Sequence, residues 1–305
     1  MYPPVFDYVR AGSIEEALDL VNERGGKFLA GGHSLLPVMK MRLADPGLLV
    51  DIGRVDGLRG ISRKGEYYTV GALTTHAEVA AVDDGGFPAA LLEAAGMIGD
   101  PQVRNRGTVG GNVAHADPAS DLPPVFAALG ATMVVASNRG KGRGAMQTRE
   151  IAATEFFTGL FETALADDEL LVSVNVSAEG PGVGSAYAKL YNKASRYAAV
   201  GVCARLAVGA DGACTSCTVA VGGLVPNATV LTDVGAGMLG RPVDSQTIAA
   251  AARVAAAAEL DVMSDIHASA RYRRQMLPVF VARALTSAGE RSHLGASGPD
   301  TGASR

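Results

Sequence analysis

Two glycine-rich segments constrain this chain more than any other feature of its sequence. The first is Ala30-Gly31-Gly32-His33-Ser34-Leu35, which follows a strand-like run, and the second is Thr108-Val109-Gly110-Gly111-Asn112. Adjacent glycines let the backbone turn sharply and allow several N–H groups to point at one bound anion. A single glycine pair between a strand and a helix is usually a plain turn. Two such segments within one predicted domain suggest a site for a dinucleotide.

The length of the chain predicts two domains, because its 305 residues exceed the roughly 100–200 residues of an ordinary domain. We place the first domain at 1–178, a linker at 179–182 and the second domain at 183–287. Within the first domain, the segment 99–124 is predicted to be a long, irregular binding loop. Apolar runs and capping residues predict helices at 14–24, 35–42, 88–97, 125–129 and 149–157. Strands are predicted at 27–30, 48–52, 131–136 and 170–176, and two more on either side of a turn at 63–66.

The second domain begins with three β-like runs at 186–191, 198–208 and 214–221, which we expect to form an antiparallel sheet. Helices are expected near 245–259 and 269–287. Pro278 should start or kink the second of these, because proline has no backbone N–H to donate. The last segment, 288–305, is rich in Ser, Gly and Ala, and we expect it to be a flexible tail.

Charge and hydropathy exclude several classes of protein. Lys and Arg number 27 against 31 Asp and Glu, a formal net charge of −4, so the chain lacks the positive field that binds nucleic acid. No apolar run is long enough to span a bilayer. The N-terminus, Met1-Tyr2-Pro3-Pro4, lacks the basic and apolar regions of a signal peptide. We therefore expect a cytoplasmic protein that does not cross a membrane.

Cysteine and histidine usage predicts no metal site in this chain. Three cysteines cannot supply the four thiolates of an all-cysteine iron–sulfur cluster, so any such cluster must lie on another chain. Cys214 and Cys217 have C-x-x-C spacing, but as strand residues they are expected to point to opposite faces. The five histidines show no spacing typical of metal ligands.

Two aspartates beside the second glycine segment have two interpretations. Asp117 and Asp121 can accept hydrogen bonds from ribose or ribityl hydroxyls of a bound dinucleotide. Alternatively, Asp121 caps the helix that is expected to follow it. The residues alone favour neither interpretation.

Taken together, the two glycine segments, with Ile98-Gly99-Asp100-Pro101-Gln102-Val103-Arg104-Asn105 before the second, resemble the FAD-binding medium subunit of the molybdenum hydroxylases. This family includes carbon monoxide dehydrogenase and the xanthine dehydrogenases. The resemblance runs from Phe6-Asp7-Tyr8 to the segment 264–274, which covers nearly the whole chain.

The resemblance implies an α+β protein. Its first part would be a two-subdomain, vanillyl-alcohol-oxidase-type (PCMH-type) FAD-binding domain, with subdomains at about 1–55 and 56–178. A small C-terminal domain of the CO-dehydrogenase-flavoprotein type, with an antiparallel sheet and helices, would follow. The positions that the resemblance assigns to FAD are Ala30, Gly31, Gly32, His33, Ser34, Leu35, Thr74, Thr108, Val109, Gly110, Gly111, Asn112, Asp121 and Lys189.

One position departs from the family pattern. The family often has an aspartate before an aromatic residue near the edge of the flavin ring, whereas this chain has Arg196-Tyr197. Arg196 either changes the flavin potential or the access of the electron acceptor, or it is an ordinary surface arginine.

The function that the resemblance implies is electron transfer within a larger enzyme. FAD on this chain would take electrons from the [2Fe-2S] clusters of a small partner subunit, and a large molybdopterin-binding subunit would oxidise the substrate. The assembly would be a dimer of heterotrimers, and no side chain of this chain is expected to act as a catalytic acid or base. Two alternatives remain open: a self-contained FAD-dependent oxidase or dehydrogenase of a small substrate, and a non-catalytic nucleotide-binding module.

Overall fold

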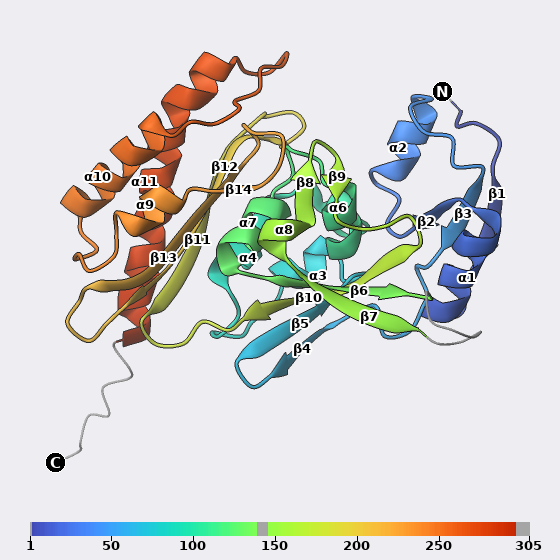
Figure 1. Ribbon diagram of the computed structural model, residues 1–305, viewed down its shortest axis with the longest axis horizontal. Helices are drawn as coiled ribbons and strands as arrows, with labels where there is room; N and C mark the ends of the chain where they lie inside the picture. The colour runs from blue at the N-terminus through green and yellow to red at the C-terminus, as the bar shows by residue number, and fades with distance from the viewer. Residues whose placement is uncertain (1, 139–145, 297–305) are drawn as a thin grey trace.

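The computed structural model describes residues 2–138 and 146–296 of the chain. It arranges them in an elongated molecule, with an N-terminal unit at one end and the C-terminal helices at the other (Figure 1). Sheets of three, five and four strands follow one another along the molecule, and a two-stranded hairpin lies beside the central sheet. No helix in the described ranges is long and apolar enough to cross a membrane.

The N-terminal unit is a small parallel sheet covered by a helix. Its elements are β1 (Asp7–Arg10), α1 (Ile14–Arg24), β2 (Lys27–Leu29), α2 (Leu35–Lys40) and β3 (Leu48–Asp51), with the strands in the order β1-β3-β2. Ser13 begins α1 by accepting the N–H of Glu16 at 3.1 Å. Leu18 of α1 is buried in one core with Val50 of β3. This packing fixes the end of β2, where the first glycine segment begins.

An antiparallel sheet in the order β4-β5-β10-β6-β7 forms the middle of the molecule. Its strands are β4 (Ile61–Lys64), β5 (Tyr67–Gly71), β6 (Thr132–Ser137), β7 (Gln147–Ala152) and β10 (Glu169–Ser177). Residues from α3 (His76–Ala80), α4 (Ala89–Met97) and α7 (Leu122–Leu129) share its core, and every residue of α7 is buried. Thr75 and Glu78 form a capping box at α3. The hairpin beside the sheet consists of β8 (Phe157–Gly159) and β9 (Glu162–Thr163).

The segment 99–124 is not the irregular loop that its composition predicts. It contains α5 (Pro101–Arg104), α6 (Val109–His115) and the beginning of α7. Asp100 begins α5 by accepting the N–H of Val103 at 2.8 Å, and Thr108 begins α6 by accepting the N–H of Gly111 at 3.1 Å. These caps, together with tertiary contacts, stabilise short helices in a segment whose glycine content lowers its intrinsic helix propensity.

The helix expected at 149–157 is also wrong. The chain there forms β7 up to Ala152, and only the four residues of α8 (Ala153–Phe156) are helical. Pairing with β6, in which Ile151 lies opposite Met133, explains the difference, because sheet contacts override a weak local helix preference.

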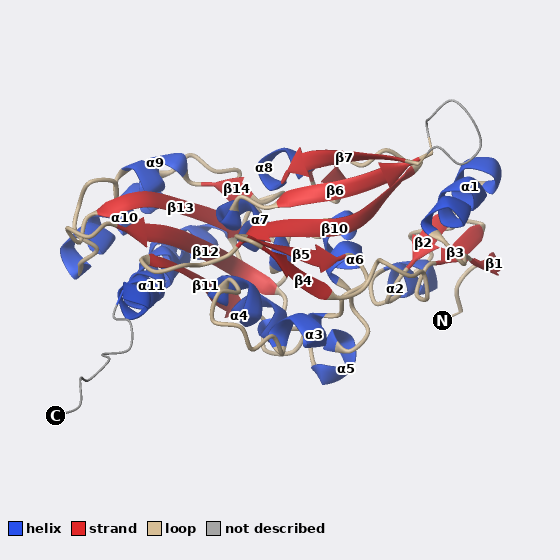
Figure 2. Cartoon of the chain, turned by 90° about the horizontal axis from the view of Figure 1, so that it is seen from below, coloured by secondary structure: helices blue, strands red, loops and turns tan. Residues whose placement is uncertain are grey.

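The C-terminal domain is an antiparallel sheet in the order β11-β12-β13-β14 with helices packed against it. Its elements are β11 (Val183–Tyr191), β12 (Ala198–Val208), β13 (Cys214–Gly222), β14 (Thr229–Val230), α9 (Thr232–Ala236), α10 (Ser245–Ala257) and α11 (Ala270–Ala296). The helices α9, α10 and α11 lie on the outer side of this sheet, while α4 and α7 of the first domain contact its inner side (Figures 1 and 2). Tyr187 and Cys203 therefore belong to the core of the first domain.

The end of the chain differs from its prediction. Pro278 lies inside α11, so of its two expected roles it does not start the helix. The flexible tail expected from residue 288 is wrong for 288–296, which continue α11, and the remainder, 297–305, lies outside the described residues. Buried Leu285 and Ala288 anchor this part of the helix to the core of the C-terminal domain.

The expected orientation of the C-x-x-C pair is wrong as well. The register of β12 and β13 shifts between Ala207 and Val208, so Thr215 has no opposite residue and the alternation of faces changes there. Cys214 and Cys217 thereby come within reach of each other, and a hydrogen bond between the thiols lowers the pKa of Cys214. Cys214 is buried in the core and Cys217 is half-buried.

A candidate cofactor cavity

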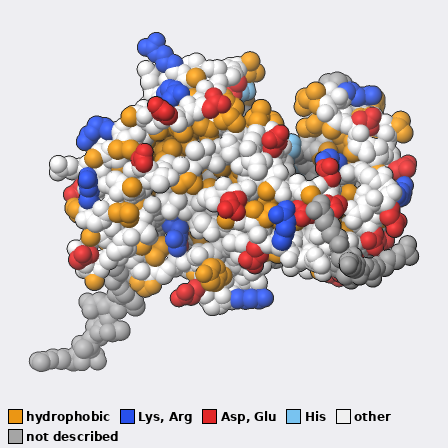
Figure 3. Space-filling view, in the orientation of Figure 1, with side chains coloured by type: hydrophobic (Ala, Val, Ile, Leu, Met, Phe, Trp, Pro, Cys, Tyr) orange, Lys and Arg blue, Asp and Glu red, His pale blue; other side chains and the backbone are white. Residues whose placement is uncertain are grey.

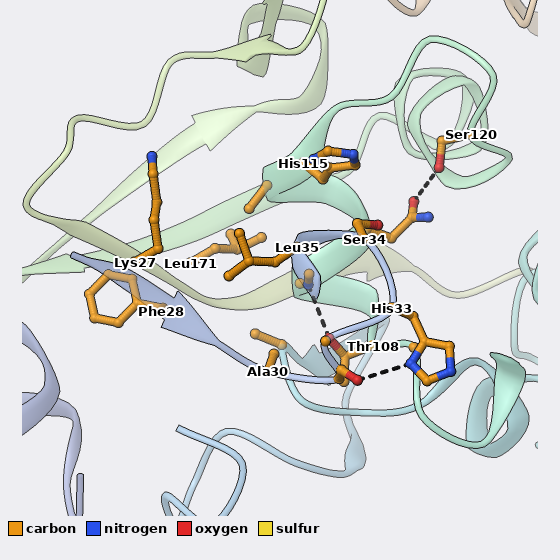
Figure 4. A pocket seen from close by; sticks show the side chains of 18 of the residues that line it. Lys27, Phe28, Ala30, His33, Ser34, Leu35, Thr108, His115, Ser120 and Leu171 are labelled. Carbon is orange, nitrogen blue, oxygen red and sulfur yellow. Dashed lines mark hydrogen bonds between the residues drawn. The ribbon is translucent and has the colours of Figure 1, made fainter. Parts of the chain in front are cut away.

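A cavity of about 780 Å³ lies between the N-terminal unit and the central sheet and extends to the turn between β11 and β12. Figure 3 shows the molecule hollowed between the N-terminal unit and the rest of the chain. Cofactor sites typically have volumes of roughly 300–1,000 Å³, so the cavity has the size of such a site. Both glycine-rich segments form part of its wall (Figure 4).

The first glycine segment offers unused hydrogen-bond donors to this cavity. The backbone N–H groups of residues 31–35 make no hydrogen bond with any residue in the described ranges. Gly32 has a φ of +73°, a conformation that glycine adopts without strain, and its carbonyl accepts the N–H of Leu36 in the first turn of α2. Ser34 precedes α2 but its hydroxyl makes no capping bond. Five amide donors on one turn suit a bound anion.

The amides of the second glycine segment are already used within the protein. Val109 donates to the carbonyl of Thr74 at 2.9 Å, and Gly110 donates to the carbonyl of Ala72 at 2.8 Å. Gly111 donates to the hydroxyl of Thr108. The second segment therefore shapes the wall and holds α6 against the end of β5, whereas the first segment supplies the unused donors.

Each glycine segment packs closely on another stretch of the chain: the first on the turn at Arg106 and Gly107, just before the second segment, and the second on Ala72, just after β5. A Cβ added to Gly31 would lie 2.0 Å from the carbonyl oxygen of Arg106, and one added to Gly110 would lie 2.5 Å from the Cβ of Ala72. Only glycine allows such an approach at these two positions. Gly31 and Gly110 are thus required for packing as well as for the turns of their segments.

Most of the residues assigned to FAD by the resemblance lie in the cavity wall. Three of them do not: Val109 is buried in the core, Thr74 is turned toward Gly60, and Lys189 lies behind Asp121. The residues that line the cavity are Ala30, Gly31, Gly32, His33, Ser34, Leu35, Thr108, Gly110, Gly111, Asn112 and Asp121.

Thr74 is expected to matter for stability and not for cofactor binding. Its buried hydroxyl accepts the N–H of Gly60 at 3.0 Å and donates to the Gly60 carbonyl at 2.9 Å. Thr74→Val should therefore lower the free energy of unfolding by about 1–3 kcal/mol, because two buried backbone groups lose their partner. Urea unfolding with a flavin titration on the same sample checks this. A large loss of flavin affinity with native stability would show that Thr74 contacts the cofactor.

A buried ion pair joins Asp121, which lines the cavity, to Lys189 behind it. Asp121 accepts hydrogen bonds from the hydroxyl of Tyr187 at 2.7 Å and from the Nζ of Lys189 at 2.8 Å, and the Lys189 side chain is only 1% exposed. Burial raises the pKa of Asp121, and Lys189 and Tyr187 oppose this effect by favouring the carboxylate. Asp121 makes no capping bond at α7, so the capping interpretation is wrong. The pair joins the first domain to β11 and places a carboxylate at the wall.

Several residues that line the cavity were not predicted from the sequence. Phe28 of β2 and Leu171 of β10 both line the cavity, on the same side of the view in Figure 4 as Lys27. Ile98 and His76 line another part. In a sequence, apolar residues on strands are indistinguishable from ordinary core residues. Only the structure, in which β2 and β10 of two different sheets border one cavity, identifies Phe28 and Leu171 as lining residues.

The mouth of the cavity carries residues with unusual backbone conformations. Phe161 (φ +56°) and Arg196 (φ +62°) both line it and both adopt the left-handed region that side chains disfavour. The ring of Phe161 packs on His115, with ring centroids 5.3 Å apart. The guanidinium of Arg196 lies over the ring of Tyr191, 5.6 Å from its centroid. Strained residues of this kind cluster at functional sites.

His76 is a buried imidazole in the cavity wall. It is 2% exposed, and its side chain packs against Gly107, where an added Cβ would lie 2.9 Å from the ring. Burial, followed by the charges of Arg104 and His33, lowers the pKa of His76 to about 4.

This depressed pKa predicts a pH effect on the chain without cofactor. Between pH 6.5 and 4 the unfolded state binds a proton that folded His76 does not, so stability falls as the pH decreases. The loss over this range is about 3 kcal/mol. His76→Gln should remove this part of the pH dependence, as measured by urea unfolding at pH 7, 5.5 and 4.5. An identical pH profile in the variant would contradict the assignment.

Comparison with known proteins decides the family. Residues 4–178 match the family model described as "FAD binding domain in molybdopterin dehydrogenase", and residues 185–288 match "CO dehydrogenase flavoprotein C-terminal domain". The chain belongs to this family of FAD-binding medium subunits. The match confirms the expected family, its α+β architecture, FAD as its cofactor and its place among the oxidoreductases.

Similar proteins cover almost the whole chain. The carbon monoxide dehydrogenase medium chain of Hydrogenophaga pseudoflava is 36% identical over 292 residues, which are 94% of this chain and 98% of that protein. The 6-hydroxypseudooxynicotine dehydrogenase complex subunit alpha of Paenarthrobacter nicotinovorans is 37% identical over 291 residues, 94% of this chain and 96% of that protein.

Solved structures of this family have the same fold over almost the whole chain. A carbon monoxide dehydrogenase of Hydrogenophaga pseudoflava that lacks the Mo-pyranopterin moiety superposes with a TM-score of 0.88 at 36% identity, covering 95% of this chain and 99% of that chain. Quinoline 2-oxidoreductase from Pseudomonas putida 86 superposes with a TM-score of 0.87 at 31% identity, covering 96% and 100%.

Proposed function

We propose that this chain is the FAD-carrying electron-transfer subunit of a multi-subunit molybdenum hydroxylase. Electrons would arrive one at a time from [2Fe-2S] clusters of a partner and leave for an external acceptor. FAD supplies this chemistry when bound, because its ring holds either one or two electrons. The residues of this chain bind the cofactor, orient it and limit the access of water.

The observation that carries the proposal is the fit of the cavity to FAD. The unused amides of residues 31–35 suit the pyrophosphate, which carries two negative charges without a titrating group near neutral pH. Phe28 and Leu171 offer apolar surfaces for a planar ring at one end. Asp121 offers acceptors for hydroxyl or ring N–H groups at another part of the wall. An extended dinucleotide has these three kinds of group in the same molecule.

The assignment of residues to FAD follows from this fit. We assign direct contact to Ala30, Gly31, Gly32, His33, Ser34, Leu35, Thr108, Gly110, Gly111, Asn112 and Asp121, which line the cavity. Thr74 and Val109 would support the wall through their bonds to neighbouring backbone. Lys189 would act through Asp121 by keeping that side chain ionised and oriented.

The proposal includes two partner subunits. Three cysteines are too few for an all-cysteine iron–sulfur cluster, so we assign the clusters to a small partner subunit. The family resemblance assigns the molybdopterin cofactor to a large one. Relatives named as a medium chain and a medium subunit support such a complex. A dimer of heterotrimers and a cytoplasmic location stay predictions.

Electron transfer without substrate oxidation is the result that tests this function. The purified chain should be photoreduced, and its reduced flavin should then pass electrons to a dye such as dichlorophenolindophenol. Carbon monoxide, an aldehyde and an N-heterocycle should each leave the 450 nm absorbance of the isolated chain unchanged. Direct bleaching by one of them would instead favour a self-contained FAD dehydrogenase.

A further inference from the structure

His76 has hydrogen-bonding capacity that the protein itself does not use. Its Nδ1 is buried without a partner, and neither ring nitrogen has a hydrogen-bond partner among residues 2–138 and 146–296. Burying an unpaired polar atom costs free energy, and such atoms are rare in folded proteins. Because the ring also lines the cavity, the position has the features of a ligand contact rather than of an ordinary core residue.

The surroundings of His76 select an anionic group. His33, on the first glycine segment, and Arg104, on α5, are the charged or titratable groups that act on it. Both disfavour a proton on the ring. On α3 itself, Glu78 is turned away, since its carboxylate is held by Thr75 and Arg59. In the chain without cofactor, therefore, no carboxylate compensates a charge on His76.

The position of His76 relative to the first glycine segment indicates which anion it would contact. Gly31 contacts the backbone of Arg106 and Gly107, and Gly107 in turn contacts the His76 ring. Gly107 therefore lies between the ring and Gly31, and the ring lines the same cavity as the unused amides of residues 31–35. An anion held by these amides brings negative charge close to the imidazole.

We propose that His76 takes up a proton when the pyrophosphate of FAD binds, so that the cofactor is held by a charged imidazolium as well as by amides. This inference rests on the proposed FAD site. Opposite charge within about 4–6 Å favours the protonated ring and reverses the effect of burial. Binding of FAD is then coupled to the uptake of one proton, and its affinity falls up to tenfold for each pH unit above the pKa of free His76.

Isothermal titration of the FAD-free chain with FAD, in buffers of different ionisation enthalpy at pH 6.5, measures this proton directly. We expect close to one proton per FAD for the wild type and for His267→Gln, an exposed histidine outside the cavity. We expect close to none for His76→Gln, together with a flat dependence of affinity on pH between 5 and 7.

Two further titrants locate the charge that His76 senses. ADP-ribose contains a pyrophosphate esterified at both ends, as in FAD, and should also cause proton uptake. Riboflavin, which has no phosphate, should cause none. Proton uptake with FAD but not with ADP-ribose would show that His76 does not sense the pyrophosphate. Proton uptake that persists in His76→Gln would show that His76 is not the group that takes up the proton.

A measurement on the wild type keeps the inference testable if the variant does not fold. The imidazole carbon-bound protons of His76 in an NMR spectrum should move to the protonated position at pH 6.5 when FAD is added. FAD binding without this change would overturn the inference and leave the proposed function standing. A folded wild-type chain that binds no FAD would instead overturn the proposed function.

Discussion

Gly31→Ala is expected to abolish retention of FAD, lowering its affinity on the order of 100-fold, or about 2.7 kcal/mol. The new Cβ would lie 2.0 Å from the carbonyl oxygen of Arg106 and 2.8 Å from its carbonyl carbon. Backbone atoms cannot move aside as the end of a flexible side chain can, so the first glycine segment must move away from the turn at Arg106 and Gly107. The amides of residues 31–35 then lose the common direction that an anion requires.

The matched control is Gly85→Ala, because a Cβ at Gly85 meets no atom within 4 Å. Both variants should be purified by gel filtration, and their flavin content, flavin affinity and melting temperature measured. Gly85→Ala should behave as the wild type. If Gly31→Ala keeps its FAD at the wild-type melting temperature, the contact of Gly31 with Arg106 does not position the amides.

Lys189→Met is expected to destabilise the chain by about 3–5 kcal/mol. Lys189 is the buried cation that pairs with Asp121, and both side chains are at most 6% exposed. Removing the cation leaves a carboxylate in a low-dielectric site with the hydroxyl of Tyr187 as its remaining partner. Because the pair joins α7 to β11, the loss should loosen the contact between the two domains.

An exposed ion pair provides the comparison. Arg59 pairs with Glu78 at 2.9 Å, with side chains 60% and 39% exposed, so Arg59→Met should cost no more than about 1 kcal/mol. The double variant Asp121→Asn with Lys189→Met should recover much of the loss, since it leaves no unpaired buried charge. Urea unfolding of all four proteins decides the matter. Equal costs for Lys189→Met and Arg59→Met would contradict the assignment.

Elements with strong local signals could be predicted closely from the sequence. The capping residue Ser13 fixes the start of α1, and the apolar runs of β3 and β12 coincide with buried strands. The errors fall where tertiary contacts override local preference. Pairing with β6 makes 147–152 a strand, and packing of Gly110 on Ala72 supports a helix in a segment whose composition favours a loop.

The candidate site could be predicted only in part, for a related reason. The glycine segments and Ser34 follow from local chemistry, and the family resemblance points to Asp121 and Lys189 as separate positions, whereas their pairing with each other is seen only in the structure. The bonds from Val109 and Gly110 to Thr74 and Ala72 join distant parts of the chain, so the sequence cannot show that these amides are already used. His76 is inconspicuous for the same reason, because its burial depends on the approach of Gly107.

The visible absorption spectrum of the purified full chain, with the released cofactor identified by chromatography, tests the central claim most directly. The account predicts a flavin spectrum with one FAD per chain, either as purified or after addition of FAD to the chain. A folded protein that is colourless and also fails to take up added FAD would contradict it.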